Sequence, residues 1–130
     1  MTRITGRIES GQGVGASFTR TDWALGVFRE AYDVDPFPGT LNVRADAGDV
    51  AAWQAAAAQG RLFKAPDPAW CDARCLRAKI RYQTHEASAI VVLPLVDSYP
   101  PDQIELVAAT ALRDWLEVRD GDPVILDLEF

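Results

Sequence analysis

The segment from Asp35 to Arg44 constrains the fold of this chain more than any other part of its sequence. It reads Asp-Pro-Phe-Pro-Gly-Thr-Leu-Asn-Val-Arg. The two prolines fix the backbone angle φ, and the glycine permits angles that other residues resist, so the first half predicts a rigid turn. The second half alternates, with Leu41 and Val43 on one face and polar residues on the other, which predicts a strand.

The polar face of that strand carries Thr40, Asn42 and Arg44, which are a hydroxyl, an amide and a guanidinium in a row. Mg²⁺ prefers oxygen ligands and commonly takes substrate phosphates and water as its further ligands. Thr40 and Asn42 are therefore candidate Mg²⁺ ligands, and Arg44 is a candidate phosphate contact. A second interpretation stays open, because both residue types also complete turns by bonding to nearby backbone.

The length of 130 residues predicts a single domain, residues 1–130. The hydrophobic share of 48% and the charged share of 25% are those of a folded protein. No apolar run approaches membrane-spanning length, and the start of the chain lacks the apolar segment of a signal peptide. We therefore expect a cytoplasmic protein with no membrane partner.

The net charge of −6 disfavours partners that are themselves strongly negative. No basic block is present, which argues against a nucleic-acid partner, since such a surface needs several phosphate-neutralising cations. A polyphosphate ligand would need a local site built from backbone N–H groups, a few arginines and a divalent cation.

The periodicity along the chain predicts many short strands with small helices between them. This pattern predicts a mainly β fold, a small β-barrel with short helical insertions. Residues 104–108 fit a strand or a helix equally well. The strands are expected at 2–9, 40–44, 61–65, 76–84, 88–95 and 124–130, and the helices at 21–32, 48–59 and 110–116.

The glycines at positions 11, 13 and 15 follow the first predicted strand. They match neither a phosphate-binding P-loop nor a dinucleotide fingerprint. Glycine at every second position would let a phosphate or a base approach the backbone closely. A flexible hairpin without a ligand is the other interpretation.

Three further features carry chemistry-bearing side chains. Glu105 interrupts the apolar run at 104–107, so its carboxylate is either exposed on a strand face or buried with a partner. Arg113 and Asp114 have a simple interpretation as a solvent-facing ion pair. Cys71 and Cys75 lack the paired spacing of a zinc site and are expected to be reduced, partly buried thiols.

Taken in order, these segments resemble the archaeal CTP-dependent riboflavin kinase family. The resemblance extends from about Gly6 to Val124. It rests on four blocks, which are Gly6-x-Ile8-x-Ser10-Gly11-x-Gly13-x-Gly15, Pro36-Phe37-Pro38-Gly39-Thr40-Leu41-Asn42-Val43, Ile104-Glu105-Leu106-Val107-Ala108, and Leu112-Arg113-Asp114 followed by Asp120-Gly121-Asp122.

The resemblance implies a six-stranded cradle-loop β-barrel and a riboflavin kinase-like domain. Members of the family transfer the γ-phosphoryl group of CTP to the 5′-hydroxyl of riboflavin, giving FMN and CDP, with Mg²⁺ as cofactor. Ser98 stands where the family tends to carry Thr, and the hydroxyl is kept. The implied roles are a catalytic role for Glu105, metal binding by Thr40 and Asn42, flavin binding by Ser98 and Glu105, and nucleotide binding by Gly11, Gln12, Gly13, Val14, Gly15, Ala16, Thr110, Ala111, Leu112 and Arg113.

Three alternatives remain at this point. The chain could be a barrel that binds a flavin or a nucleotide without chemistry, although a flavin binder needs no metal. It could be a structural or regulatory barrel related to DNA-binding proteins, which the negative charge disfavours. It could also be the same kinase with ATP or another triphosphate as donor, since no residue distinguishes cytosine from adenine. The oligomeric state is open.

Overall fold

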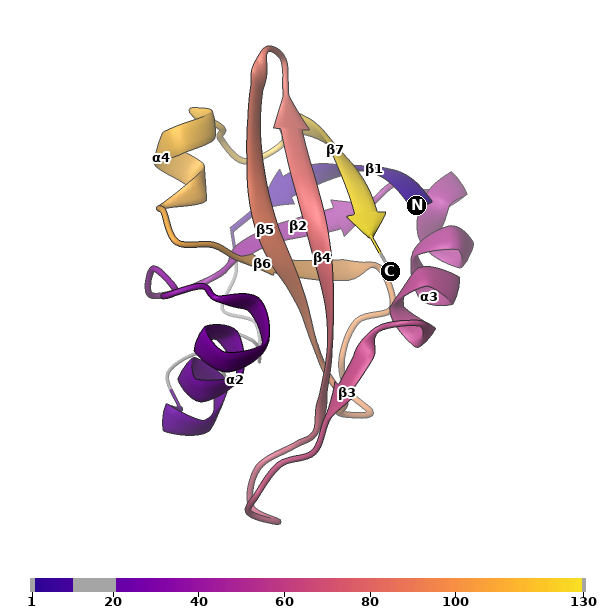
Figure 1. The fold of residues 1–130 in the computed structure, drawn as a ribbon. Helices are drawn as coiled ribbons and strands as arrows, with labels where there is room; N and C mark the ends of the chain where they lie inside the picture. Colours follow the sequence, from indigo (N-terminus) through magenta and orange to yellow (C-terminus); the bar gives the residue numbers. More distant parts are fainter. Residues whose placement is uncertain (1, 11–20, 130) are drawn as a thin grey trace.

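The structure is a computed structural model that describes residues 2–10 and 21–129. Strands dominate this part of the chain, and short helices connect them (Figure 1). The elements are β1 (Thr2–Glu9), α2 (Asp22–Tyr32), β2 (Leu41–Ala45), the 3₁₀ helix η1 (Ala47–Asp49), α3 (Val50–Ala58), β3 (Arg61–Phe63), β4 (Ala73–Tyr82), β5 (His85–Pro94), β6 (Gln103–Val107), α4 (Leu112–Leu116) and β7 (Pro123–Glu129).

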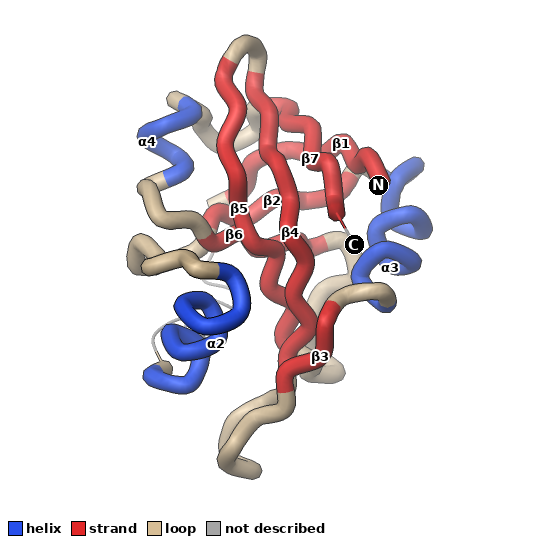
Figure 2. The backbone as a smooth tube through the Cα atoms, viewed as in Figure 1, coloured by secondary structure: helices blue, strands red, loops and turns tan. Residues whose placement is uncertain are grey.

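Six antiparallel strands form a closed barrel in the order β4, β5, β6, β2, β1, β7 (Figure 2). The barrel closes where β7 returns to β4, with Arg77 opposite Glu129 and Arg81 opposite Ile125. The short strand β3 pairs with the start of β4, at Ala73–Cys75, before β7 takes over that edge. The predicted mainly β, six-stranded barrel with helical insertions is therefore confirmed.

Alternation along the strands directs one set of apolar side chains into the barrel. In β1, for example, Ile4 and Ile8 are fully or almost fully buried, while the residues between them are polar or small. The helices α3 and α4 supply further side chains to this core, including Trp53 and Leu116. These helices lie on opposite sides of the barrel in Figure 1.

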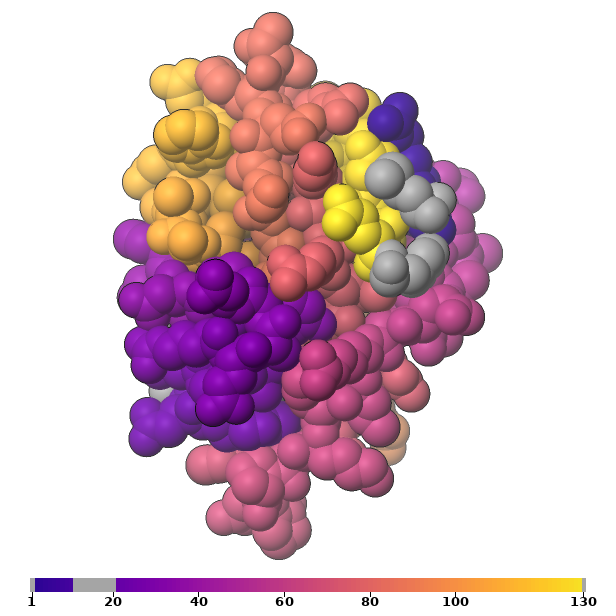
Figure 3. Space-filling view, in the orientation of Figure 1, coloured from indigo at the N-terminus to yellow at the C-terminus, as the bar shows by residue number. Residues whose placement is uncertain are grey.

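A second apolar cluster lies outside the barrel, between α2 and the outer face of β4, β5 and β6. Phe28 of α2 is fully buried there, and Val92 and Val107 come from β5 and β6. In the space-filling view α2 covers a broad part of the molecular face (Figure 3). Because both faces of these strands are covered, β5 reads as a continuous apolar run rather than an alternating one.

Helix α2 begins and ends as its sequence indicates. The Thr21 side chain accepts a hydrogen bond of 3.1 Å from the Ala24 backbone N–H, which is the expected N-cap. Asp33 ends the helix in the left-handed region, with φ of 53°. The predicted helix 21–32 is confirmed.

Most other predicted elements are confirmed with shifted ends. The ambiguous segment at 104–108 is a strand, β6. The helix predicted from residue 48 opens with the 3₁₀ turn η1, so α3 begins at Val50. The strand predicted from residue 76 already begins at Ala73, because alternating small residues Ala73 and Cys75 give little periodic signal.

Both cysteines are free thiols, as predicted. Cys75 is buried, and its burial raises the pKa of the thiol to about 12. In the part of the chain that the structure describes, no helix is long and apolar enough to cross a membrane.

Candidate functional site

The strand register sets three chemistry-bearing side chains in one row. Glu9 of β1 lies opposite Asn42 of β2, and Asn42 lies opposite Glu105 of β6. Directly opposed residues share a face of a sheet, and this face points away from the barrel interior, because Leu41 and Val43 point inward. The row lies beside the end of β1, where the glycine-rich segment begins.

Glu105 is a buried carboxylate held by two hydroxyl groups. Its side chain is 0% exposed. The Thr40 hydroxyl donates to Oε1 at 3.1 Å, and the Tyr99 hydroxyl donates to Oε2 at 2.6 Å. Of the two interpretations left open by the sequence, burial with partners is therefore the observed one. Burial and the neighbouring carboxylate both raise the pKa of Tyr99, so its hydroxyl stays protonated as a donor.

A cavity of about 260 Å³ is lined by Thr40, which bonds to Glu105. The Pro-Gly turn with Thr40 forms one wall, and the segment from Thr110 to Asp114 forms the other. The two walls are tied together by a hydrogen bond of 2.8 Å from the Phe37 N–H to the Ala108 carbonyl. The fold thus brings a predicted metal ligand and the predicted nucleotide-binding residues Thr110, Ala111, Leu112 and Arg113 to one cavity.

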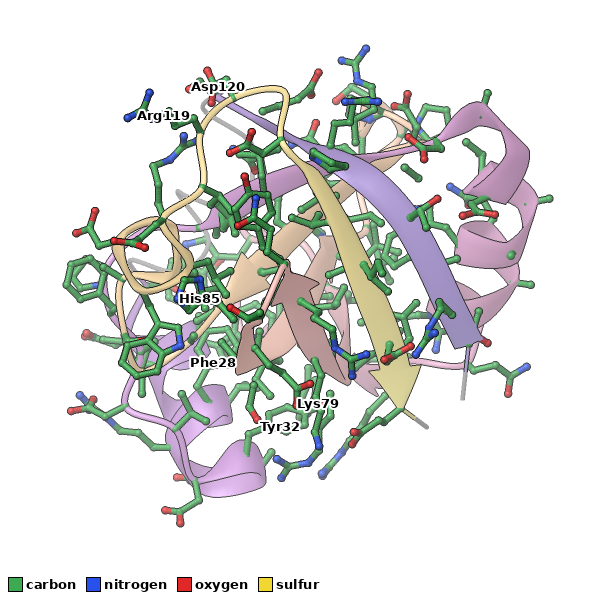
Figure 4. All side chains as sticks on the ribbon, turned by 90° about the horizontal axis from the view of Figure 1, so that it is seen from above. Phe28, Tyr32, Lys79, His85, Arg119 and Asp120 are labelled. Atoms are coloured by element: carbon green, nitrogen blue, oxygen red, sulfur yellow. The ribbon has the colours of Figure 1, made fainter. Side chains whose placement is uncertain are left out.

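Arg113 connects that cavity wall to the end of β1. Its guanidinium forms an ion pair with Asp120 at 3.0 Å and approaches the Glu9 carbonyl at 3.5 Å. A hydrogen bond with Ser10 and the pairing with Arg113 both keep the pKa of Asp120 below its usual range. The interpretation of Arg113 and Asp114 as an ion pair is wrong, because Asp120, in the loop before β7 (Figure 4), is the partner.

The remaining predicted nucleotide-binding residues lie outside the described residues. They are Gly11, Gln12, Gly13, Val14, Gly15 and Ala16. The described chain does fix the two ends of this segment, because it leaves β1 after Glu9 and resumes at the cap of α2. Glu9, the last residue of β1, lies opposite Asn42, in the same row as Glu105.

The predicted flavin residue Ser98 is exposed in the loop between β5 and β6. The neighbouring residue, Tyr99, is the one that reaches Glu105. Tyr99 also lines a second cavity of about 360 Å³ together with Pro100, Pro101 and Gln54 of α3. Sequence reasoning did not identify Tyr99, and the only available signal was a tyrosine in a proline-rich loop next to a predicted site residue.

Arg44 lies on the same face of β2 as Asn42, as predicted, and acidic side chains of the protein neutralise its charge. Its guanidinium pairs with Glu9 at 2.9 Å and lies 3.7 Å from Asp102. A phosphate contact would therefore compete with two carboxylates for this side chain.

The oxygen atoms around Glu105 fit the chemistry of a Mg²⁺ site. Because Thr40 donates its proton to Glu105, the lone pairs of its oxygen remain available for a cation. Asn42 contributes a carboxamide on the same face, opposite Glu105. No group of three or more His, Cys, Asp or Glu side chains in the described ranges is arranged to hold a metal ion. Neutral oxygens completed by phosphates and water are the donor set that Mg²⁺ accepts.

Comparison with known proteins gives one matching family model. It covers residues 8–128, bears the short name CTP-dep_RFKase and is described as "Domain of unknown function DUF120". Among curated proteins, the chain is similar to the riboflavin kinase of Methanocella arvoryzae, with 32% identity over 126 residues, covering 97% of this chain and 56% of the relative.

Two other similar proteins are also named riboflavin kinase. The protein of Haloquadratum walsbyi is 31% identical, with 99% of this chain and 57% of the relative covered. The protein of Saccharolobus solfataricus is 28% identical, with 96% and 73% covered. The chain thus spans little more than half the length of the first two of these three relatives.

Proposed function

The chain belongs to the CTP-dependent riboflavin kinase family, and from this premise we propose that it transfers the γ-phosphoryl group of CTP to the 5′-hydroxyl of riboflavin. The products are FMN and CDP. The relatives that carry the name riboflavin kinase support the general reaction. The choice of CTP as donor rests on the family name.

The observation that carries the proposal is the meeting of two distant segments at one cavity. Thr40 follows the Pro-Gly turn, the segment Thr110–Arg113 forms the opposite wall, and the Glu105 carboxylate is bonded to Thr40. Phosphoryl transfer requires in-line positioning and charge neutralisation more than covalent participation of the protein. A cavity with the Thr40 hydroxyl on one wall and the Arg113 guanidinium on the other is suited to a metal–phosphate group.

Mg²⁺ is the cofactor that we propose for this site, with the Thr40 hydroxyl and the Asn42 carboxamide as its protein ligands. When bound, the ion would neutralise charge on the phosphates of the nucleotide. The protein's own part is to fix the ligand oxygens. Glu105 does so by accepting a hydrogen bond from the Thr40 hydroxyl, which directs the lone pairs of the Thr40 oxygen away from the carboxylate.

Glu105 and Ser98 are the residues that we propose for the flavin side. A carboxylate has about four acceptor positions, so Glu105 can accept a hydrogen bond from the 5′-hydroxyl of riboflavin beside those from Thr40 and Tyr99. In a loose transition state the attacking hydroxyl keeps its proton until late, so orientation is the main contribution of Glu105. Ser98 supplies a second hydroxyl from the loop that carries Tyr99.

One experiment tests this function directly. The purified protein is incubated with riboflavin, Mg²⁺ and each of the four nucleoside triphosphates in turn, and flavin products are separated by HPLC. FMN formed with CTP and at most weakly with the others is the expected result. FMN formed only with ATP would reassign the donor. Riboflavin binding without FMN from any triphosphate would overturn the kinase function in favour of a flavin-binding barrel.

A further inference from the structure

The sequence assigned no role to Tyr99, the neighbour of Ser98, yet Tyr99 touches the buried carboxylate of the site. It comes from the loop between β5 and β6, whereas Thr40 comes from the end of the Pro-Gly turn. The two hydroxyls approach the same carboxylate, with Tyr99 on Oε2 at 2.6 Å and Thr40 on Oε1 at 3.1 Å. Each oxygen of Glu105 is thereby held by a different part of the chain.

Two donors on two oxygens restrict the rotation of a carboxylate more than one donor does. Glutamate has several rotatable bonds, and hydrogen bonds to an ionised group are stronger than those between neutral groups. Without the Tyr99 hydroxyl, a fully buried carboxyl oxygen would lose a short hydrogen bond. The carboxylate would then reorient toward other donors or water, and Thr40 would lose its fixed acceptor.

We infer that Tyr99 is a positioning residue: acting through Glu105, it holds the Thr40 hydroxyl in the orientation that leaves the lone pairs of Thr40 available to the cavity. The inference rests on the proposed function, because it assigns Tyr99 a part in the same phosphoryl transfer. Tyr99 needs no contact with either substrate for this role. It links the flavin-side loop to the metal-side turn through one carboxylate.

The test is a double-mutant cycle between Tyr99→Phe and Glu105→Gln. Phenylalanine removes only the hydroxyl, and glutamine keeps the shape of Glu105 without its charge. The matched control is Tyr32→Phe, since Tyr32 of α2 (labelled in Figure 4) is also a largely buried tyrosine. Its ring contacts Phe63 and Arg77 instead of Glu105. For each protein, kcat and KM for riboflavin are measured, and the riboflavin Kd is measured separately by flavin fluorescence without nucleotide. Thermal unfolding confirms that each variant is folded.

We expect Tyr99→Phe to lower kcat/KM for riboflavin by about 10- to 100-fold, the effect of losing a hydrogen bond to a charged group. We expect Tyr32→Phe to stay within about twofold of the wild type. In the Glu105→Gln protein, the further change Tyr99→Phe should matter by less than about threefold, because the charged group through which it acts is gone.

Two results would overturn the inference. One is an equal loss from Tyr99→Phe in both backgrounds, which would mean that Tyr99 acts without Glu105. The other is a Tyr99→Phe protein as active as the Tyr32→Phe control. If the wild-type protein forms no FMN, the proposed function fails separately. The riboflavin Kd values of the wild type, the two single variants Tyr99→Phe and Glu105→Gln, and the double variant then decide the inference. Non-additive effects on Kd support it, and additive effects contradict it.

Discussion

Thr40 and Glu105 are 65 residues apart in the sequence and are joined by a hydrogen bond of 3.1 Å. The bond links the end of the Pro-Gly turn to the middle of β6. It also fixes the orientation of the Thr40 hydroxyl. A donor committed to a carboxylate presents its oxygen to a cation rather than its proton. The effect of the Thr40 hydroxyl can therefore be measured apart from the effect of the side chain's shape, by variants that change only one of the two.

Replacing Thr40 by valine should abolish most of the activity. Valine has almost the same shape but no hydroxyl, so both the proposed metal ligand and the donor to Glu105 are lost. We expect the rate of FMN formation to fall by about 100-fold or more. Thr40→Ser, which keeps the hydroxyl, should remain within about tenfold of the wild type. Equal rates for the valine and serine variants, measured by HPLC, would contradict the proposed role of the hydroxyl.

Replacing Asn42 by alanine should remove Mg²⁺-dependent FMN formation while the protein stays folded. Asn42 is only 6% exposed and lies opposite Glu105. The change therefore deletes a candidate ligand from the group of oxygen atoms formed by Thr40, Asn42 and Glu105. Turnover is measured over a series of Mg²⁺ concentrations, and circular dichroism checks the fold. Turnover equal to that of the wild type at all concentrations would show that Asn42 holds no metal.

Glu105→Gln should weaken riboflavin binding more than nucleotide binding. The amide keeps the shape of the side chain but lacks the charge that attracts the hydroxyls of Thr40, Tyr99 and the substrate. We expect the riboflavin Kd to rise by about tenfold more than the CTP Kd. Isothermal titration with each ligand measures both values, and equal increases would count against a flavin-side role.

Local sequence patterns predicted the elements that depend on neighbouring residues. Alternation predicted β1 and β2, and the Thr21 cap predicted the start of α2. The closure of the barrel through β4 and β7 joins segments about fifty residues apart, and no local pattern encodes that pairing. The pattern of short strands and small helices predicted a mainly β barrel, and the resemblance to a family supplied its six-stranded, cradle-loop form.

Within the site, too, sequence patterns predicted individual residues but not the long-range contacts between them. The sequence marked Thr40, Asn42 and Glu105, but only the β2–β6 register brings them together. The Tyr99 contact and the pairing of Arg113 with Asp120 depend on how two loops fold back, which sequence spacing does not determine. The nearest acidic neighbour in the sequence, Asp114, was therefore the wrong partner for Arg113.

Gly6→Ala should destabilise the barrel. A Cβ at Gly6 would lie 2.5 Å from the Arg44 carbonyl oxygen and 2.8 Å from a Val43 methyl group, so β1 and β2 would have to separate. We expect a loss of about 1–3 kcal/mol in the free energy of unfolding, the usual effect of overpacking. The control is Gly26→Ala in α2, where a Cβ meets nothing within 4 Å.

The control variant should behave in the opposite direction. Alanine in a helix interior is favoured over glycine by about 0.5–1 kcal/mol, so Gly26→Ala should raise stability slightly. Urea unfolding measures both variants under the same conditions. A Gly6→Ala protein as stable as the wild type would show that the two strands tolerate the added methyl group.

Asp127→Asn should lower stability at neutral pH and have little effect in acid. Asp127 of β7 receives Arg3 of β1 on both oxygens, at 2.8 and 3.2 Å, which ties the first strand to the last. The hydrogen bond from Arg3, with the charges of Arg3, Arg81 and Lys79, keeps the pKa of this carboxyl below its ordinary 3.8. A carboxyl with a lowered folded-state pKa stabilises the protein above its unfolded-state pKa and loses that contribution as the pH falls through the folded-state value.

The Tm difference between wild type and Asp127→Asn should therefore be full at about pH 7 and shrink steadily below about pH 4. Thermal unfolding at a series of pH values measures it. The control is Asp35→Asn, whose carboxylate pairs with Arg29 on the surface, with 80% of the Asp35 side chain exposed, and whose loss should change Tm little at any pH. A difference for Asp127→Asn that persists unchanged into acid would mean that the asparagine disturbs packing rather than removing the charge that Arg3 holds.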